Sequence, residues 1–147
     1  MSDKTSIPAF SPPQAALAAL SVAHRISRTD ADALGDFIAT QAAFAALDNI
    51  AQAQEMAQAL AQDISDATDG FDTLLNLLAA ALRDDAAATA YCLCADFIAL
   101  HGRVSPEEMR FLERLGDALG IDRLSRAAFD RAAQARTTPP ILVRDPK

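Results

Sequence analysis

The chain has 147 residues, enough for one domain and hardly enough for two. Hydrophobic residues make up 51% of it and charged residues 22%, a balance that argues against global disorder. The chain contains 34 alanines but only 5 glycines and 1 tyrosine. Helix-forming residues therefore dominate, and strand-favouring residues are scarce. This composition favours an all-α fold, and the net charge of −7 lacks the basic footprint of a nucleic-acid-binding protein.

The charge is unevenly distributed along the chain. Residues 1–100 carry 4 basic and 13 acidic side chains, whereas residues 101–147 carry 9 basic and 7 acidic ones. Two solvated faces that differ by chance would explain this distribution. The sharper alternative is a basic C-terminal third that meets an acidic surface, within the molecule or on a partner. Protein partners or self-association are therefore open possibilities, and nucleic acid is not expected.

Residues 1–11 are expected to form a polar arm that leads into the first helix. Pro12-Pro13 suits the first turn of a helix that runs to about His24, and Ser11 is placed to cap it.

The apolar segment 15–23 within this first helix resembles the core of a signal peptide. Asp3 beside Lys4 does not suit the leader, however, and His24-Arg25 stands where a small-residue cleavage site belongs. No apolar run approaches the ~20 residues of a transmembrane helix. We therefore expect a cytoplasmic protein with no transmembrane segment.

Three more helices are predicted before residue 83. Ser27 or Thr29 is expected to cap a helix whose apolar positions continue to about residue 47, and the next helix spans about 50–64. Residues Asp66 to Gly70 are then predicted to form a turn.

Asp69 is expected to cap the leucine-rich helix that follows this turn. The carboxylate-rich stretch 63–72 suggests a calcium loop, but the EF-hand register would place Ser65 and Asn76 at its first and twelfth positions. The stretch is therefore interpreted as a solvated turn.

Residues 86–100 are apolar nearly all round, so this helix is expected at the centre of the fold. Leu93 and Phe97 from this helix should be buried together with Leu112 and Leu115 from the next one. Cys92 and Cys94 in the same helix are interpreted as inert thiols.

Ser105-Pro106-Glu107-Glu108 predicts a helix start with a capping box. Met109, Leu112, Leu115 and Leu119 should face inward along that helix, which is expected to end at Gly120.

The last predicted helix spans about 122–136, with Leu124, Ala128 and Ala132 facing inward. Pro139-Pro140 prevents it from continuing, so residues 137–147 are expected to form an extended tail. The apolar triplet of Ile141, Leu142 and Val143 in this tail is predicted to dock in a groove, on its own domain or on a neighbour's.

A shift of 78 residues aligns two helix–loop–helix units. The matched pairs include Arg25 with Arg103, Ile26 with Val104, Ser27 with Ser105, and Asp30 with Glu108. Alanine-rich helices align easily with one another, but the shared serine and third-position acid favour a duplicated helical hairpin. The two loops of such a hairpin pair could lie close together.

The segment Cys94–Gly120 resembles the TerB-like, tellurite-resistance family. The matching residues are Gly102, Val104, Ser105, Glu108 and Leu119-Gly120, while His101 stands at the position of the family's aspartate. The resemblance implies a compact single domain of about seven helices over residues 1–147. It also implies a cytoplasmic role linked to tellurite and metal stress, with no enzymatic reaction.

The family's aspartate and glutamate are sometimes discussed as a cation site, which makes His101 and Glu108 candidate metal ligands. Asp30 and His24 are the candidates in the first unit. A histidine and carboxylate set suits zinc or another transition metal better than calcium. Each residue also has a structural interpretation: a histidine stabilises a helix end, and an acid completes a capping box.

The sequence contains no glycine-rich phosphate loop, H-E-x-x-H or G-x-S-x-G motif, so catalysis finds little support. We expect a non-enzymatic stress-response or adaptor module that acts through protein or ion binding. One alternative is a metal-binding protein that uses His101 and nearby carboxylates as ligands for a divalent ion. Another is a small hydrolase or lyase built on a carboxylate cluster.

Overall fold

The computed structural model describes residues 10–102 and 104–140, and in these residues it contains helices but no strand. The helices are α1 (Pro12–Ser27), α2 (Ala33–Ala39), the short 3-10 helix η1 (Ala42–Phe44), α3 (Ile50–Ser65), α4 (Gly70–Ala81), α5 (Asp85–Leu100), α6 (Pro106–Ala118) and α7 (Arg123–Thr137). The predicted all-α fold of about seven helices is confirmed. The apolar triplet 141–143 lies outside the described residues.

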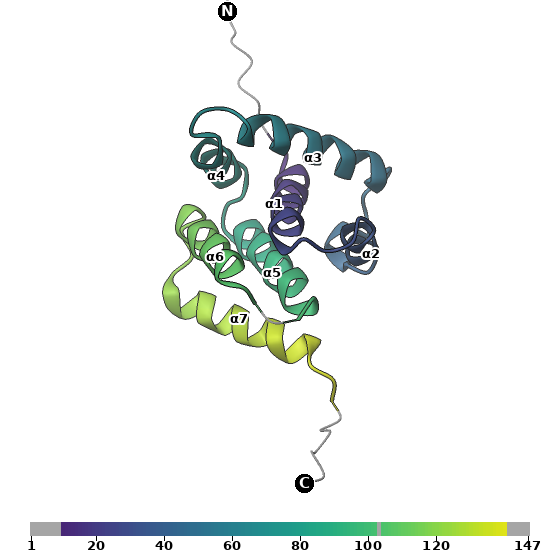
Figure 1. The fold of residues 1–147 in the computed structure, drawn as a ribbon, viewed down its shortest axis with the longest axis vertical. Helices are drawn as coiled ribbons and strands as arrows, with labels where there is room; N and C mark the ends of the chain where they lie inside the picture. The colour runs from purple at the N-terminus through teal and green to yellow at the C-terminus, as the bar shows by residue number, and fades with distance from the viewer. Residues whose placement is uncertain (1–9, 103, 141–147) are drawn as a thin grey trace, which may run out of the picture.

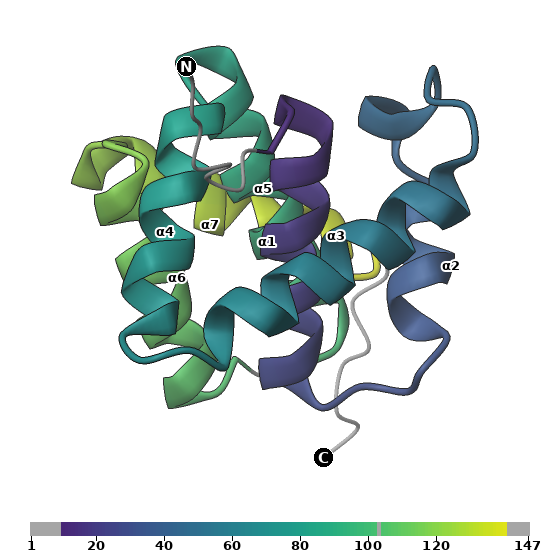
Figure 2. The same ribbon diagram turned by 90° about the horizontal axis from the view of Figure 1, so that it is seen from above.

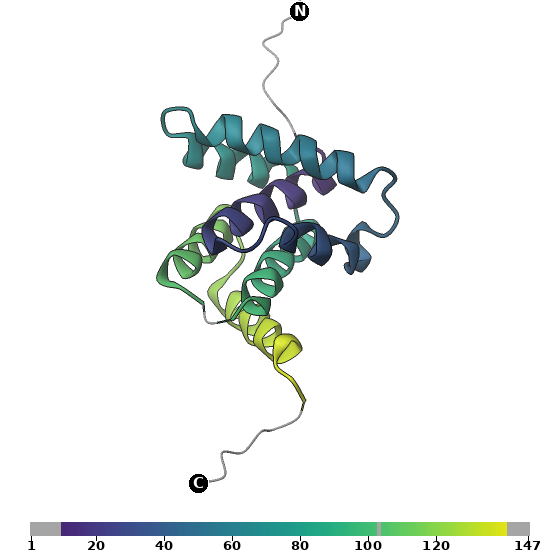
Figure 3. The same cartoon turned by 45° about the vertical axis from the view of Figure 1, so that its right-hand side comes forward.

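Helices α1 and α5 lie at the centre of the arrangement (Figure 1). Helix α1 packs between α3 and α5, and α5 packs in turn against α7. Helices α4 and α6 lie together on one flank, while α2 lies on the other (Figure 2). Turning the molecule shows α3 and α4 on one side of α1 and α7 on the opposite side of α5 (Figure 3). The central pair is therefore covered from several directions.

A single cluster of buried apolar side chains draws on all seven described α-helices. The four residues predicted to be buried together, Leu93, Phe97, Leu112 and Leu115, all belong to it. Helix α1 is as central as α5, because every residue from Ala15 to Ala23 is buried. Among the described helices, none combines the length and apolar character needed to cross a membrane.

Both cysteines of α5 are free thiols. Burial raises the pKa of the Cys94 thiol far above its ordinary value, and burial likewise raises the pKa of the Cys92 thiol. Both therefore stay protonated near neutral pH, as suits the inert thiols predicted from the sequence.

Local capping rules set the starts of α1 and α6. Ser11 accepts a hydrogen bond from the Gln14 backbone nitrogen at 3.3 Å, and Gln14 Oε1 accepts one from the Ser11 nitrogen at 3.0 Å. Ser105 and Glu108 make the same reciprocal pair at 3.1 and 2.7 Å. Both capping boxes have proline in the first helical turn, so the two predicted helix starts are confirmed.

Replacing Ser105 with alanine should lower the free energy of unfolding by about 0.5–2 kcal/mol, because the Glu108 nitrogen loses its capping acceptor. Urea denaturation of both proteins measures this difference. Ser105→Asn is the matched control: asparagine also caps helices and should recover most of the stability. Equal losses in both variants would show that the cap contributes nothing.

The predicted second helix differs from the structure at both ends. Helix α1 continues to Ser27 and ends at Arg28, which has a left-handed φ of 56°, so Ser27 cannot cap α2. Asp32 occupies the N-cap position of α2 without a side-chain capping bond. The helix ends at Ala39 rather than near residue 47. Just after this end, Thr40 Oγ1 donates to the Phe37 carbonyl at 2.8 Å. Such a local bond competes with continued helix.

The two serines matched by the predicted repeat do not have equivalent roles. Ser27 is the last residue of α1, whereas Ser105 caps the start of α6. Arg25 lies inside α1, and its proposed counterpart Arg103 lies outside the described residues. The equivalence of the two serines as caps is therefore wrong, and the duplication itself stays a prediction.

The inward faces predicted for α6 and α7 are partly wrong. Met109 is 61% exposed and Leu124 is 83% exposed, and Ala128 is also exposed. Phe111 is buried on α6, and Ala133 is buried on α7. The difference arises because helical spacing gives several apolar faces on these helices, and tertiary packing selects among them.

The turn before α4 is shaped by close packing. Asp69 has a left-handed φ of 55° and starts the helix without a side-chain capping bond, so the predicted helix start is confirmed but the side-chain cap is wrong. A Cβ atom on Gly70 would lie 2.1 Å from the Ile64 carbonyl oxygen and 2.6 Å from that of Ser65. Only glycine fits there without a shift of the backbone.

Candidate functional site

The loops that follow α1 and α5 meet at the carboxylate of Glu108. Glu108 is only 6% exposed, and Ser27 Oγ at the end of α1 donates a hydrogen bond to its Oε2. Its Oε1 accepts the Ser105 backbone nitrogen at 2.7 Å. One buried carboxylate therefore joins two segments that are 81 residues apart in sequence.

The two histidines both lie against Phe97. The ring centroids of His24 and His101 are 6.0 and 4.5 Å from that of Phe97. His24 Nε2 donates to the backbone carbonyl of Asp30 at 2.9 Å, and His101 Nδ1 donates to the carbonyl of Phe97 at 2.7 Å. Each imidazole thus holds a loop or a helix end, which is the structural role that the sequence left open.

A shallow acidic hollow brings two of the predicted ligands to one surface. Asp30 and His101 line it together with Asp32 and Asp36. Thr29 also lines it, and the Oγ1 of Thr29 is buried without a hydrogen-bond partner among the described residues.

The four predicted metal ligands, His101, Glu108, Asp30 and His24, do not assemble into a metal site. Within residues 10–102 and 104–140, no three His, Cys, Asp or Glu side chains are arranged to hold a metal ion. Glu108 is occupied by the two serines, and each histidine has one ring nitrogen bonded to a carbonyl. The metal hypothesis stays a prediction without geometric support.

Adding zinc should leave the thermal unfolding temperature unchanged, because His101 already bonds to the Phe97 carbonyl. Thermal melts of the wild type and of His101→Ala, each with zinc and with chelator, check this. A metal bound only by the folded state raises the melting temperature with concentration. A zinc-dependent rise that disappears in His101→Ala would contradict the expectation and restore the metal site.

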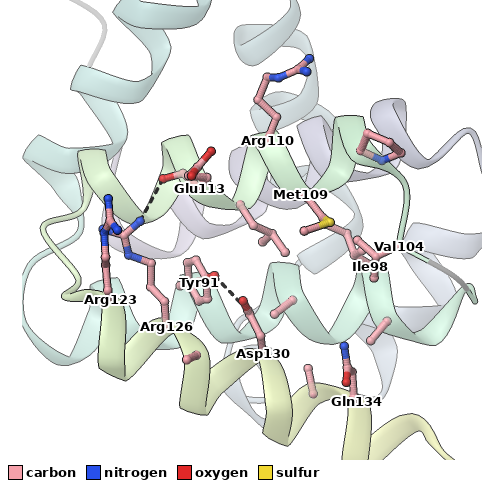
Figure 4. A pocket seen from close by; sticks show the side chains of 16 residues that line it. Tyr91, Ile98, Val104, Met109, Arg110, Glu113, Arg123, Arg126, Asp130 and Gln134 are labelled. Carbon is pink, nitrogen blue, oxygen red and sulfur yellow. Dashed lines mark hydrogen bonds between the residues drawn. The ribbon is translucent and has the colours of Figure 1, made fainter.

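A cleft of about 610 Å³ lies between α5, α6 and α7 (Figure 4). Its floor and walls are largely apolar, and Met109 of α6 points into it opposite α7. The side chains that make up its apolar lining include Ala95, Ile98, Ala99, Val104, Met109 and Leu112. Sequence reasoning missed this cleft because it placed Met109 in the core.

One end of the cleft carries a fixed cation. Arg126 Nε donates to the Ile121 carbonyl at 2.7 Å, and its Nη2 contacts Asp117 Oδ1 at 2.8 Å. Its Nη1 donates to the Glu113 carbonyl at 3.3 Å. These bonds hold α6 and α7 together at that end. Arg123 lies beside Arg126 at the same end of the cleft.

A partly buried polar pair lies on the cleft wall between α5 and α7. Tyr91 Oη donates to Asp130 Oδ1 at 2.9 Å (Figure 4). Burial raises the pKa of the Asp130 carboxyl, and the hydrogen bond from Tyr91 opposes that rise. Burial also raises the pKa of the Tyr91 hydroxyl, so it keeps its proton and remains a donor.

No family model, no curated protein and no solved structure matches this chain.

Proposed function

We propose that this chain is a non-enzymatic, TerB-like stress-response module of the cytoplasm that acts by binding a protein segment in the α5–α6–α7 cleft. The observation that carries the proposal is the apolar cleft itself, into which the exposed Met109 points. A concave apolar surface with a few polar groups at its edge is the usual form of a binding site.

The hydrogen bonds of the predicted site residues favour the binding of a protein segment over the binding of an ion. His24, His101 and Glu108 all hold the scaffold together through hydrogen bonds. The cleft, in contrast, has buried core residues such as Ile98 and Leu112 at its floor and exposes Met109, which no buried contact of the core requires.

The charge around the cleft indicates the chemistry of the partner. Arg110, Arg123 and Arg126 line it against two acids, Glu113 and Asp130, although the whole chain carries a net charge of −7. Asp130 is already bonded to Tyr91. A partner segment with adjacent apolar side chains and a flanking carboxylate would match both the floor and the basic edge.

Fluorescence anisotropy tests the site with a labelled peptide of three leucines followed by two glutamates. Met109→Glu places a carboxylate in the cleft and should weaken binding to the full chain at least about tenfold. Met56→Glu is the matched control, because Met56 is 56% exposed on α3, away from the cleft. Equal affinities for the two variants would refute the cleft as the binding site.

The stress-response part of the proposal needs a separate test in cells. Deleting the gene from its source organism should lower tolerance to tellurite. The wild-type chain and Met56→Glu should restore growth, whereas Met109→Glu should not. Unchanged tolerance after deletion would remove the tellurite role and leave the binding measurement unaffected.

A further inference from the structure

The apolar triplet of Ile141, Leu142 and Val143 has no place in the function proposed above. We propose that residues 141–147 fold back into the cleft of their own chain and occupy it. The docking itself rests on the cleft and the tail. Its regulatory consequence, competition with a partner segment, rests on the proposed function.

The tail begins close to one end of the cleft. Gln134, in the last turn and a half of α7, lines the cleft opposite Val104 (Figure 4). The helix ends three residues later at Thr137, and Pro139-Pro140 stops it from continuing. Residue 141 therefore follows the Gln134 end of the cleft after a short connection.

The tail is also long enough for the cleft. Seven residues follow Pro140 in the sequence, and an extended segment of that length spans about 23 Å. The part of α7 that lines the cleft runs from Arg123 to Gln134, which is about 16 Å of helix. Residues 135–140 lie beyond the lining, and part of the tail must span them on its return. A tail that reverses after the prolines can therefore run antiparallel to α7 along part of the cleft.

The order of side chains in the tail matches the order along the cleft. Near the Gln134 end the lining is apolar and includes Ile98, Val104 and Met109 (Figure 4). In an antiparallel arrangement the first tail residues to reach this end are the apolar triplet 141–143. Burying these side chains against the apolar lining supplies the driving force for docking.

The charges that follow the triplet continue the match. Asp130 lies farther along α7, and Arg126 lies one turn beyond it. Arg144 and Asp145 follow the triplet in the sequence, so in this arrangement they would lie on the side of the triplet that faces Asp130 and Arg126. Opposite charges would then approach each other, whereas a parallel arrangement would lead the tail away from these groups.

A segment tethered to the cleft binds it more readily than the same segment free in solution. A short linker gives an effective concentration in the millimolar range, so even weak docking leaves the cleft mostly occupied. A partner must then displace the tail, and loss of the tail should raise the apparent affinity for the partner.

The test compares amide chemical shifts of full-length variants by NMR. Leu142→Asp should shift the amide resonances of cleft residues such as Ile98, Met109 and Gln134, because a charged side chain would leave the apolar lining. Leu124→Asp is the matched control, since Leu124 is 83% exposed on α7 and does not line the cleft. It should leave the α5 and α6 resonances unchanged. Unchanged cleft resonances in Leu142→Asp would overturn the proposal.

A labelled peptide of residues 138–147 provides a second readout. It should bind the full-length Leu142→Asp chain at least about tenfold more tightly than the wild type, whose cleft is already occupied. Adding Met109→Glu should abolish the gain. Equal binding to the wild type and Leu142→Asp would contradict self-occupation.

Light scattering after gel filtration identifies the chain that receives the tail. The wild type and Leu142→Asp should both have the mass of a monomer. A wild-type dimer that Leu142→Asp converts into a monomer would place the tail in a second copy and overturn docking within one chain. If the leucine–glutamate peptide binds the cleft while the tail variants change nothing, only this inference fails and the proposed function stands.

Discussion

Replacing Phe97 with alanine should lower the free energy of unfolding by about 3–5 kcal/mol, the usual cost of truncating a buried phenylalanine. The side chain is fully buried at the centre of α5. Its ring lies 5.4 Å from that of Phe37 in an edge-on arrangement, and it contacts the rings of both histidines. Truncation would open a cavity that touches α1, α2 and α5 at once.

Urea denaturation, with a linear extrapolation to water, measures the loss. Leu124→Ala is the control: it removes a large apolar side chain that faces solvent and should change stability by less than about 0.5 kcal/mol. A loss below about 1 kcal/mol for Phe97→Ala would mean that α5 is peripheral.

Replacing Gly70 with alanine should destabilise the protein by about 1–3 kcal/mol, as overpacking does. The added methyl group would meet two backbone carbonyl groups, those of Ile64 and Ser65, rather than a flexible side chain. Either the end of α3 or the start of α4 must move to make room.

Gly35→Ala gives an opposite expectation in the same protein. A Cβ atom at Gly35 meets nothing within 4 Å, and the residue lies inside α2. Alanine should therefore stabilise the chain by about 0.5–1 kcal/mol through its better helix propensity. Thermal melts of the two variants should move in opposite directions. A stabilising Gly70→Ala would show that the α3–α4 turn relaxes freely.

The features that follow local rules were predictable from the sequence. Ser11 and Ser105 each stand three residues before a side chain that completes a capping box, and proline marks the first turn of both helices. The all-round apolar pattern of α5 likewise predicted its burial. These signals lie within a few residues or along one helix, so no knowledge of the packing is needed.

The features that depend on tertiary contacts were missed or only partly predicted. The bond between Ser27 and Glu108 joins residues 81 positions apart, and only the suspected repeat suggested that these loops meet. Met109 and Leu124 fit a helical apolar pattern equally well whether buried or exposed. Which face of α6 meets α5, and therefore where a cleft remains, depends on how three helices fit together.

The enclosure of α1 has a consequence for the order of events during synthesis. This helix is synthesised well before one part of its cover, α5, which ends at Leu100. At about 5–20 residues per second, α1 waits roughly 4–15 s for that partner after its own last residue is made. Its buried run Ala15–Ala23 is apolar apart from Ser21, and it is exposed on the α5 side throughout this interval. Nascent chains that end before Leu100 should therefore be the ones that chaperones hold.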